Sequence, residues 1–254
     1  MLIRSLIFTT LFFLTTLVLS LTVVLLAPFS FAVRLQIGVV WAHVNLWLLK
    51  QICGLAYVVE GAEHIPAENG IALLKHSSTF ETLVLFLLFP LPCIVLKREL
   101  MWIPFLGWAL ALIKPIAINR RAHRSAVRQV VHTGRSRLAE GLWVVIFPEG
   151  TRMPAGETRR YGISGALLAN ETGRPVTPVA HNAGDFWPRR GLRKHPGVIR
   201  VVVGPPIQTR GMEPTAINEA AKRWIDHTMV DISEAHRGDI VAGESESTIV
   251  KNRR

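Results

Sequence analysis

The longest uninterrupted apolar stretch opens the chain. No charged residue occurs between Ser5 and Val33, a run of 29 positions, and a helix needs only about 20 to span the hydrocarbon core of a bilayer. A second uncharged stretch runs from Leu35 to Leu49 and contains two tryptophans, which favour the headgroup level. A signal peptide is the alternative, but its apolar region is usually about 7–15 residues long. We therefore predict that residues 1–55 form a membrane anchor, with either one spanning helix and one interfacial helix or two helices in one leaflet.

From residue 56 onward, short β-rich runs alternate with helical segments. Continuous apolar runs, as expected of strands covered on both faces, predict strands at 56–60, 71–75, 93–97, 115–119, 143–147, 176–180 and 198–203. Apolar periodicity and glycine or proline at the ends predict helices at 122–140, 163–172 and 214–235. This alternation predicts an α/β domain over residues 56–236, a largely parallel twisted sheet flanked by helices. Residues 237–254 are polar and aperiodic and are predicted to be a flexible tail.

The charge balance adds information about partners. The 254 residues include 29 basic and 18 acidic side chains, for a formal net charge of +11, and the mean hydropathy is +0.32. Such an excess favours an anionic membrane surface, an acidic substrate or nucleic acid. Nucleic acid is disfavoured, because basic and aromatic residues do not interleave and no nucleic-acid-binding motif occurs. Cys53 and Cys93 lie in apolar runs and are predicted to be free buried thiols rather than a disulfide.

The sequence KHSSTFET at 75–82 offers the first candidate chemistry. Ser78 to Glu81 fits a capping box ahead of the apolar run 83–89, so Ser78 is predicted to cap a helix and Glu81 to bond back to its backbone. His76 ends an apolar strand, where α/β folds place ligands. From the first helical turn, the Glu81 carboxylate can also reach the imidazole, fix its tautomer and stabilise its charged form. We expect one carboxylate oxygen to serve the helix and the other the imidazole.

The sequence FPEGTR at 147–152 follows another predicted strand. Gly150 permits a sharp turn with positive φ, and Arg152 offers a planar fork for a phosphate. Taken alone, this stretch is equally compatible with a strand, a turn and a surface arginine. His181 follows the strand at 176–180 and is interpreted as a structural or substrate-side residue rather than a catalytic one.

Four short blocks occur in order: His76-x4-Glu81, Arg120 at the end of KPIAINR, FPEGTR at 147–152, and VTPVAHNAG at 176–184. With this order and these spacings, the chain resembles the glycerolipid acyltransferases, in particular the bacterial 1-acylglycerol-3-phosphate acyltransferases, which make phosphatidic acid. The resemblance covers roughly residues 55–210, and a hydrophobic N-terminal anchor suits that family. The usual first block of the family is His-x4-Asp, so Glu81 is a departure by one methylene group.

The resemblance implies transfer of an acyl group from acyl-CoA or acyl carrier protein to the sn-2 hydroxyl of lysophosphatidate. It makes His76 the general base and Glu81 its partner. On the lysophosphatidate side it implies five substrate-binding residues, with the arginines on the phosphate: Arg120, Glu149, Gly150, Thr151 and Arg152. No metal and no cofactor are implied, since an alcohol and a thioester need only base catalysis and an oxyanion site. Because these donors are cytosolic in bacteria, the domain is expected on the cytoplasmic face of the inner membrane.

Three alternatives stay open. The acceptor can be another lysophospholipid or a lyso-aminolipid, the same histidine can activate water in a thioesterase, or the chain can be a membrane-anchored nucleic-acid-binding module. The basic stretches 97–128 and 186–212 are compatible with a solvated face or with contact to anionic headgroups. The apolar stretch LMWIPFLGW at 100–108 is either part of the core or a ridge pressed into the leaflet.

Overall fold

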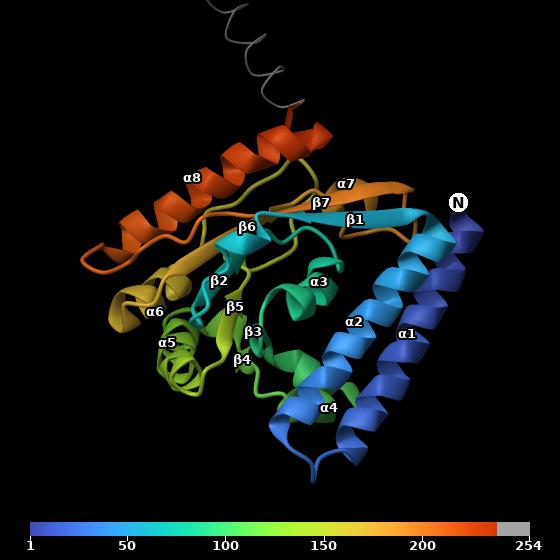
Figure 1. The fold of residues 1–254 in the computed structure, drawn as a ribbon, viewed down its shortest axis with the longest axis horizontal. Helices are drawn as coiled ribbons and strands as arrows, with labels where there is room; N and C mark the ends of the chain where they lie inside the picture. The colour runs from blue at the N-terminus through green and yellow to red at the C-terminus, as the bar shows by residue number, and fades with distance from the viewer. Residues whose placement is uncertain (238–254) are drawn as a thin grey trace, which may run out of the picture.

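The computed structural model describes residues 1–237 and begins with a helical hairpin, α1 (Leu2–Leu25) and α2 (Phe31–Cys53) (Figure 1). The hydroxyl of Ser30 caps α2, and Gly54 ends it in the left-handed region with φ of 66°. Both helices are long and apolar enough to cross a membrane by length and composition. The predicted helix pair is thus confirmed, and its depth in a bilayer stays a prediction.

Among residues 54–237, a seven-stranded sheet forms the centre of the fold, in the order β1-β7-β6-β2-β5-β3-β4. Its strands are β1 (Leu55–Glu60), β2 (Ile71–Leu74), β3 (Pro92–Lys97), β4 (Ile116–Ile118), β5 (Trp143–Ile146), β6 (Val176–His181) and β7 (Gly197–Val203). Every neighbouring pair is parallel except β6 and β7, which are antiparallel. Each predicted strand is therefore present, and the largely parallel sheet is confirmed.

Helices cover both faces of the sheet (Figure 1). One face packs against α5 (His123–Ala139), α6 (Ser164–Thr172) and α8 (Pro214–Ile232), and the other against α2 and α3 (Glu81–Leu88). In β2, Ile71 and Leu73 join the first layer, whereas Ala72 and Leu74 join the second. Because successive strand residues point to opposite faces, this double burial explains the uninterrupted apolar runs in the sequence. Burying one such leucine contributes about 1.5–3 kcal/mol.

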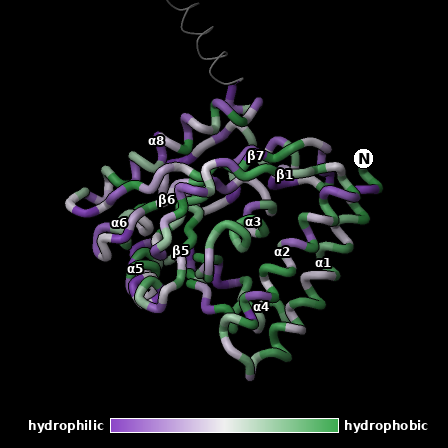
Figure 2. The backbone as a smooth tube through the Cα atoms, viewed as in Figure 1, coloured by the Kyte–Doolittle hydropathy of each residue, from purple (hydrophilic) through white to green (hydrophobic). Residues whose placement is uncertain are grey.

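The stretch at 100–108 lies at the surface and includes the start of α4 (Leu106–Leu112). Trp102 is 67% and Trp108 53% exposed, and Ile103 and Phe105 are exposed beside them. Helix α4 packs on α1, so this ridge adjoins the anchor, and the hydropathy colouring marks the same corner of the molecule as apolar (Figure 2). Exposed apolar patches of this kind are typical of membrane or protein contacts, which favours the leaflet interpretation of this stretch.

Three further sequence predictions concern the end of α8, the cysteines and the C-terminal tail. Helix α8 ends at Ile232 rather than Ala235, because Ser233 takes an extended conformation after it. Cys53 and Cys93 are free and buried, as expected. Of the tail predicted at 237–254, all but Arg237 lies outside the described residues.

Candidate active site

The candidate residues converge at one edge of the sheet. Strand β2 lies between β5 and β6 and is parallel to both, so the carboxyl ends of all three open at the same edge. His76 follows β2, the segment 147–152 follows β5, and His181 ends β6. Such an edge is where open α/β sheets place their ligands.

His76 and Glu81 form a close, nearly dry pair. The Nδ1 atom of His76 lies 2.7 Å from Oε1 of Glu81, whose side chain is fully buried. Because a carboxylate only accepts, Nδ1 carries the hydrogen, and the lone pair of Nε2 stays available. The imidazole also stacks on the ring of Phe147, with centroids 4.2 Å apart. The tautomer and the plane of the ring are therefore both fixed, and a general base needs that preorganisation.

Glu81 also organises the start of α3. Its Oε1 accepts hydrogen bonds from the amides of Ser77 and Ser78, at 3.0 and 2.9 Å. The helix begins at Glu81 with Phe80 as a cap that makes no side-chain hydrogen bond, and the Ser78 hydroxyl accepts only from the Phe80 amide at 3.3 Å. The predicted Ser78 cap is thus wrong in position, because the cap is Phe80, whereas the predicted bond from Glu81 back to the backbone of Ser78 is confirmed. The expected division between the two oxygens is only partly correct: Oε2 accepts from the Ser78 amide at 3.1 Å, but Oε1 takes the imidazole and the amides of Ser77 and Ser78 as well.

His181 is a third buried residue beside this pair. It is fully buried, its Nε2 donates to the carbonyl of Lys75 at 2.8 Å, and its Nδ1 accepts from the amide of Ala183. Burial lowers the pKa of His181, which fits a neutral ring with one donor and one acceptor. Burial alone raises the pKa of Glu81, but the contacts with His181, His76 and the Ser78 amide prevail and hold that pKa below its ordinary value. Glu81 is thus an anion, and of the two roles left open for His181, structural or substrate-side, its burial and its two backbone bonds favour the structural one.

Lys75 and Glu149 form a second buried pair that the sequence analysis missed. Nζ of Lys75 lies 2.5 Å from Oε1 of Glu149 and also donates to the carbonyl of Glu157 at 2.8 Å. The other oxygen of Glu149 accepts from the backbone amide of His76 at 2.9 Å. Burial raises the pKa of Glu149, and the Lys75 charge opposes that shift. The available signal was a lysine that ends an apolar strand, since a buried lysine needs an anionic partner.

This pair bears on the substrate-binding role expected of Glu149. Both carboxylate oxygens are occupied by donors from the His76 strand, and the amide of Met153 donates to the His76 carbonyl at 2.7 Å. The segment that follows β5 therefore holds His76 by both sides of its backbone. Contact of Glu149 with a substrate stays a prediction, whereas its role in positioning His76 follows from these bonds.

Two arginines meet beside this segment. Arg120 donates to the carbonyl of Gly150, which turns with φ of 68°, and Nε of Arg152 is buried without a hydrogen-bond partner within residues 1–237. Burial lowers the pKa of Arg120; Glu99 opposes that shift and the charge of Arg152 adds to it. Thr151 stands half-buried between Gly150 and Arg152. Two guanidinium groups this close suit an anion such as a phosphate. Within the described residues, no three His, Cys, Asp or Glu side chains lie close enough to hold a metal ion.

This fold and edge agree with comparisons to known proteins. Residues 56–182 match the family model described as Acyltransferase, and the chain belongs to that family of enzymes. Among its relatives, a 1-acyl-sn-glycerol-3-phosphate acyltransferase of Pseudomonas aeruginosa is 45% identical over 196 residues, which is 76% of each chain. The human 1-acyl-sn-glycerol-3-phosphate acyltransferase alpha is 28% identical over 187 residues, which is 72% of this chain and 66% of that protein.

A solved structure shares the fold. The 1-acyl-sn-glycerophosphate acyltransferase PlsC of Thermotoga maritima superposes with a TM-score of 0.75 and covers 90% of this chain and 96% of its own, at 22% sequence identity. The similarity extends beyond the sheet into the N-terminal helices, because 90% of this chain exceeds the share of residues 56–254 alone. The α/β architecture with its N-terminal helix pair is therefore a shared fold.

Proposed function

We propose that this protein transfers a fatty acyl group from acyl-CoA or acyl carrier protein to the sn-2 hydroxyl of 1-acylglycerol-3-phosphate, giving phosphatidic acid. The observation that carries the proposal is the buried His76–Glu81 pair, with Nδ1 of the histidine 2.7 Å from Oε1 of Glu81 and Nε2 without a hydrogen-bond partner among residues 1–237. The names of the relatives support this acceptor. The same proposal places the domain on the cytoplasmic face of the inner membrane, with the apolar helices α1 and α2 in the leaflet.

The reaction proceeds by direct attack. Nε2 of His76 takes the proton of the sn-2 hydroxyl as its oxygen attacks the thioester carbonyl carbon. The tetrahedral intermediate collapses, the carbon–sulfur bond breaks and an ester forms. The leaving thiolate takes the proton back from the imidazolium, so the base is regenerated. Glu81 stabilises the imidazolium between these two steps, and because its carboxylate is buried, this interaction is stronger than in water.

Arg120 and Arg152 hold the phosphate of the acceptor in this proposal. Changing both to glutamine is expected to lower kcat/KM for lysophosphatidate by about 10²- to 10⁴-fold, because each of the two charge-assisted hydrogen bonds contributes about 1.5–3 kcal/mol. Transfer to monoacylglycerol, which lacks the phosphate, should change little. Steady-state assays with both acceptors measure the difference, and Arg223→Gln, an exposed arginine on α8, serves as the control. An equal loss of kcat/KM with both acceptors would show that the arginines do not bind the phosphate.

Glu81→Gln tests the acid of the pair. The amide keeps an oxygen for the backbone donors of Ser77 and Ser78 but removes the charge that stabilises the imidazolium. We expect kcat to fall by at least about 10²-fold, as when a histidine loses its carboxylate partner in other enzymes, with little change in KM. Glu81→Asp should retain more activity than Glu81→Gln. If Glu81→Gln keeps near-full activity, then Glu81 serves the helix and not the chemistry.

The overall assay uses purified full-length protein in detergent with labelled acyl-CoA and a panel of lysolipids. Transfer to lysophosphatidate above all other acceptors supports the proposal. A preference for a different lysophospholipid or a lyso-aminolipid would change the acceptor and keep the chemistry. Release of free fatty acid without transfer would identify a thioesterase instead.

A further inference from the structure

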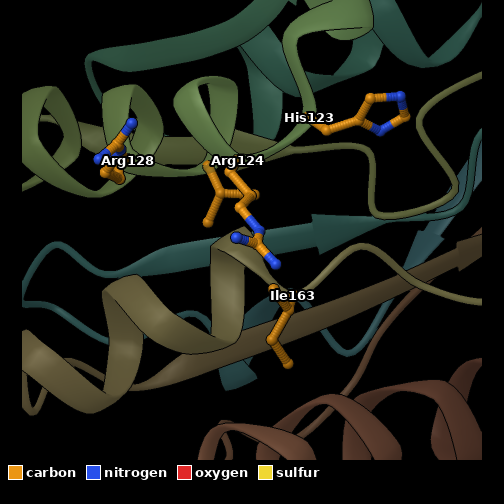
Figure 3. Close-up of a pocket in the computed structure, with 5 residues that line it drawn as sticks. His123, Arg124, Arg128 and Ile163 are labelled. Carbon is orange, nitrogen blue, oxygen red and sulfur yellow. The ribbon is translucent and has the colours of Figure 1, made fainter.

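A basic cavity lies between α5 and α6, outside the site described above (Figure 3). It has a volume of about 650 Å³ and is lined by His123, Arg124, Val127, Arg128 and Ile163. Figure 3 shows Arg124 reaching from the first turn of α5 toward Ile163 at the start of α6. No step of the proposed acyl transfer uses these side chains, so the reaction gives the cavity no role.

The positive charge around this cavity is not neutralised by the protein. Arg124 and Arg128 are exposed, and among residues 1–237 neither makes an ion pair or a side-chain hydrogen bond. No acidic residue occurs in the sequence between Glu99 and Glu140. Unpaired like charges on one turn of a helix repel one another and destabilise it. A cavity that gathers them is suited to a ligand with several negative charges.

The cavity and the candidate active site share a wall. The 3-10 turn Arg120–Ala122 begins with Arg120 at the candidate active site and is followed directly by His123, which lines the cavity. On the other side, the amide of Gly162, which precedes Ile163, donates to the carbonyl of Pro148 in the segment after β5. A ligand anchored in the cavity therefore lies next to the segment that holds His76, so that one extended molecule can occupy both places.

The side chains that line the cavity favour an anion that also has an apolar, planar part. Val127, Ile163 and the aliphatic stems of the arginines provide an apolar floor, and guanidinium groups bind phosphates bidentately and stack on planar rings. A flat heterocycle that carries several phosphates satisfies both features. An acidic protein surface would need a broad complementary interface of about 800 Å² on each partner and would gain little from one small apolar-floored cavity.

We propose that this cavity binds the phosphorylated adenosine end of acyl-CoA, so that its thioester reaches toward His76. This inference rests on the proposed acyl transfer and adds to it the donor and the place where the donor is held. Arg124 and Arg128 contact the phosphates, and the apolar floor contacts the adenine. The lysophosphatidate phosphate stays with Arg120 and Arg152, on the other side of the shared wall.

A truncated donor tests this assignment. Palmitoyl-pantetheine carries the same thioester as palmitoyl-CoA but lacks the nucleotide and its phosphates. For the Arg124→Gln/Arg128→Gln double variant we expect KM for palmitoyl-CoA to rise by about 10-fold or more, since two charge-assisted contacts are lost. The variant and the wild type should differ by less than about twofold in kcat/KM for palmitoyl-pantetheine. Arg223→Gln on α8 is the matched control and should behave as wild type with both donors.

Each contrary result has a distinct meaning. Equal losses with palmitoyl-CoA and palmitoyl-pantetheine, or a rise in KM for lysophosphatidate alone, would overturn the nucleotide assignment while acyl transfer itself stands. If the double variant loses activity with acyl carrier protein as donor but not with palmitoyl-CoA, the arginines contact the carrier protein and not a nucleotide, and the assignment is overturned. Equilibrium binding of free CoA to the full-length protein adds a readout that is independent of turnover. If the wild type binds CoA no better than the double variant does, the cavity does not bind it, whether or not acyl transfer occurs.

Discussion

Replacing His76 with alanine is expected to lower kcat for acyl transfer by about 10²- to 10⁴-fold, the usual contribution of a positioned general base. The variant loses the group that accepts the proton of the acceptor hydroxyl. The backbone at this position is held independently of the ring, because Glu149 accepts from the His76 amide and the Met153 amide donates to its carbonyl. Glu81 likewise keeps its bonds to the amides of Ser77 and Ser78. The fold and the donor KM should therefore change little.

Steady-state kinetics and thermal unfolding of the detergent-solubilised protein measure the two effects separately. His132→Ala, which removes an exposed histidine on α5, is the control and should leave both quantities unchanged. A His76→Ala variant with a normal melting temperature and more than about a tenth of wild-type kcat would show that the base lies elsewhere. A large fall in melting temperature would instead assign a structural role to the imidazole, through its contact with Phe147.

Strands could be predicted from this sequence because burial on two faces leaves a strong local signal. Runs such as Val144 to Ile146 contain no polar residue, and every predicted strand has a counterpart in the sheet. The order of the strands carries no such signal. Placing β2 between β5 and β6 depends on contacts between residues about 70 and 100 positions apart, such as Ala72 with Val145 and Thr177.

The same limit applies to the site. The pairing of His76 with Glu81 could be predicted because the two residues are close in sequence and a capping motif places the carboxylate in the first helical turn. The Lys75–Glu149 pair joins residues that follow two neighbouring strands, β2 and β5, and depends on strand order. Only the fold reveals that Glu149 is turned toward Lys75 and the His76 backbone, whereas the sequence motif alone suggested a substrate contact.

The anchor provides a further example. Its helices were predicted from hydropathy, but their attachment to the α/β domain was not. Lys194, which is almost fully buried, donates to the hydroxyl of Thr9 in α1 and lies over the rings of Phe8 and Trp187, at 5.5 and 5.3 Å from their centroids. Cation–π contacts that are shielded from water can be worth about 2 kcal/mol. The helix pair is thus packed against the α/β domain, and this contact fixes the position of α1 relative to the sheet.

The buried Lys75–Glu149 pair leads to the second large effect. Lys75→Met is expected to lower the free energy of unfolding by about 3–5 kcal/mol, because it leaves the Glu149 carboxylate buried without a counter-charge. Burial raises the pKa of Glu149 while Lys75 opposes the shift, so in the variant the carboxyl either takes up a proton or remains an unpaired charge. An acid whose pKa is raised by folding makes the folded state less stable as pH rises. The free energy of unfolding of the variant should therefore be lower at about pH 8 than at about pH 5.

The double variant Lys75→Met/Glu149→Gln separates the charge from the packing. It removes both charges, so most of the stability lost in Lys75→Met should return, and the pH dependence should disappear, since a neutral replacement of a buried ion pair is often nearly neutral in stability. Activity should stay low, because the glutamine is a weaker acceptor for the His76 amide than the carboxylate. Thermal unfolding of the wild type, Lys75→Met, Glu149→Gln and the double variant across this pH range, together with kcat, forms a double-mutant cycle. Additive losses in the double variant would contradict the pairing, because partners that act as a unit give non-additive changes.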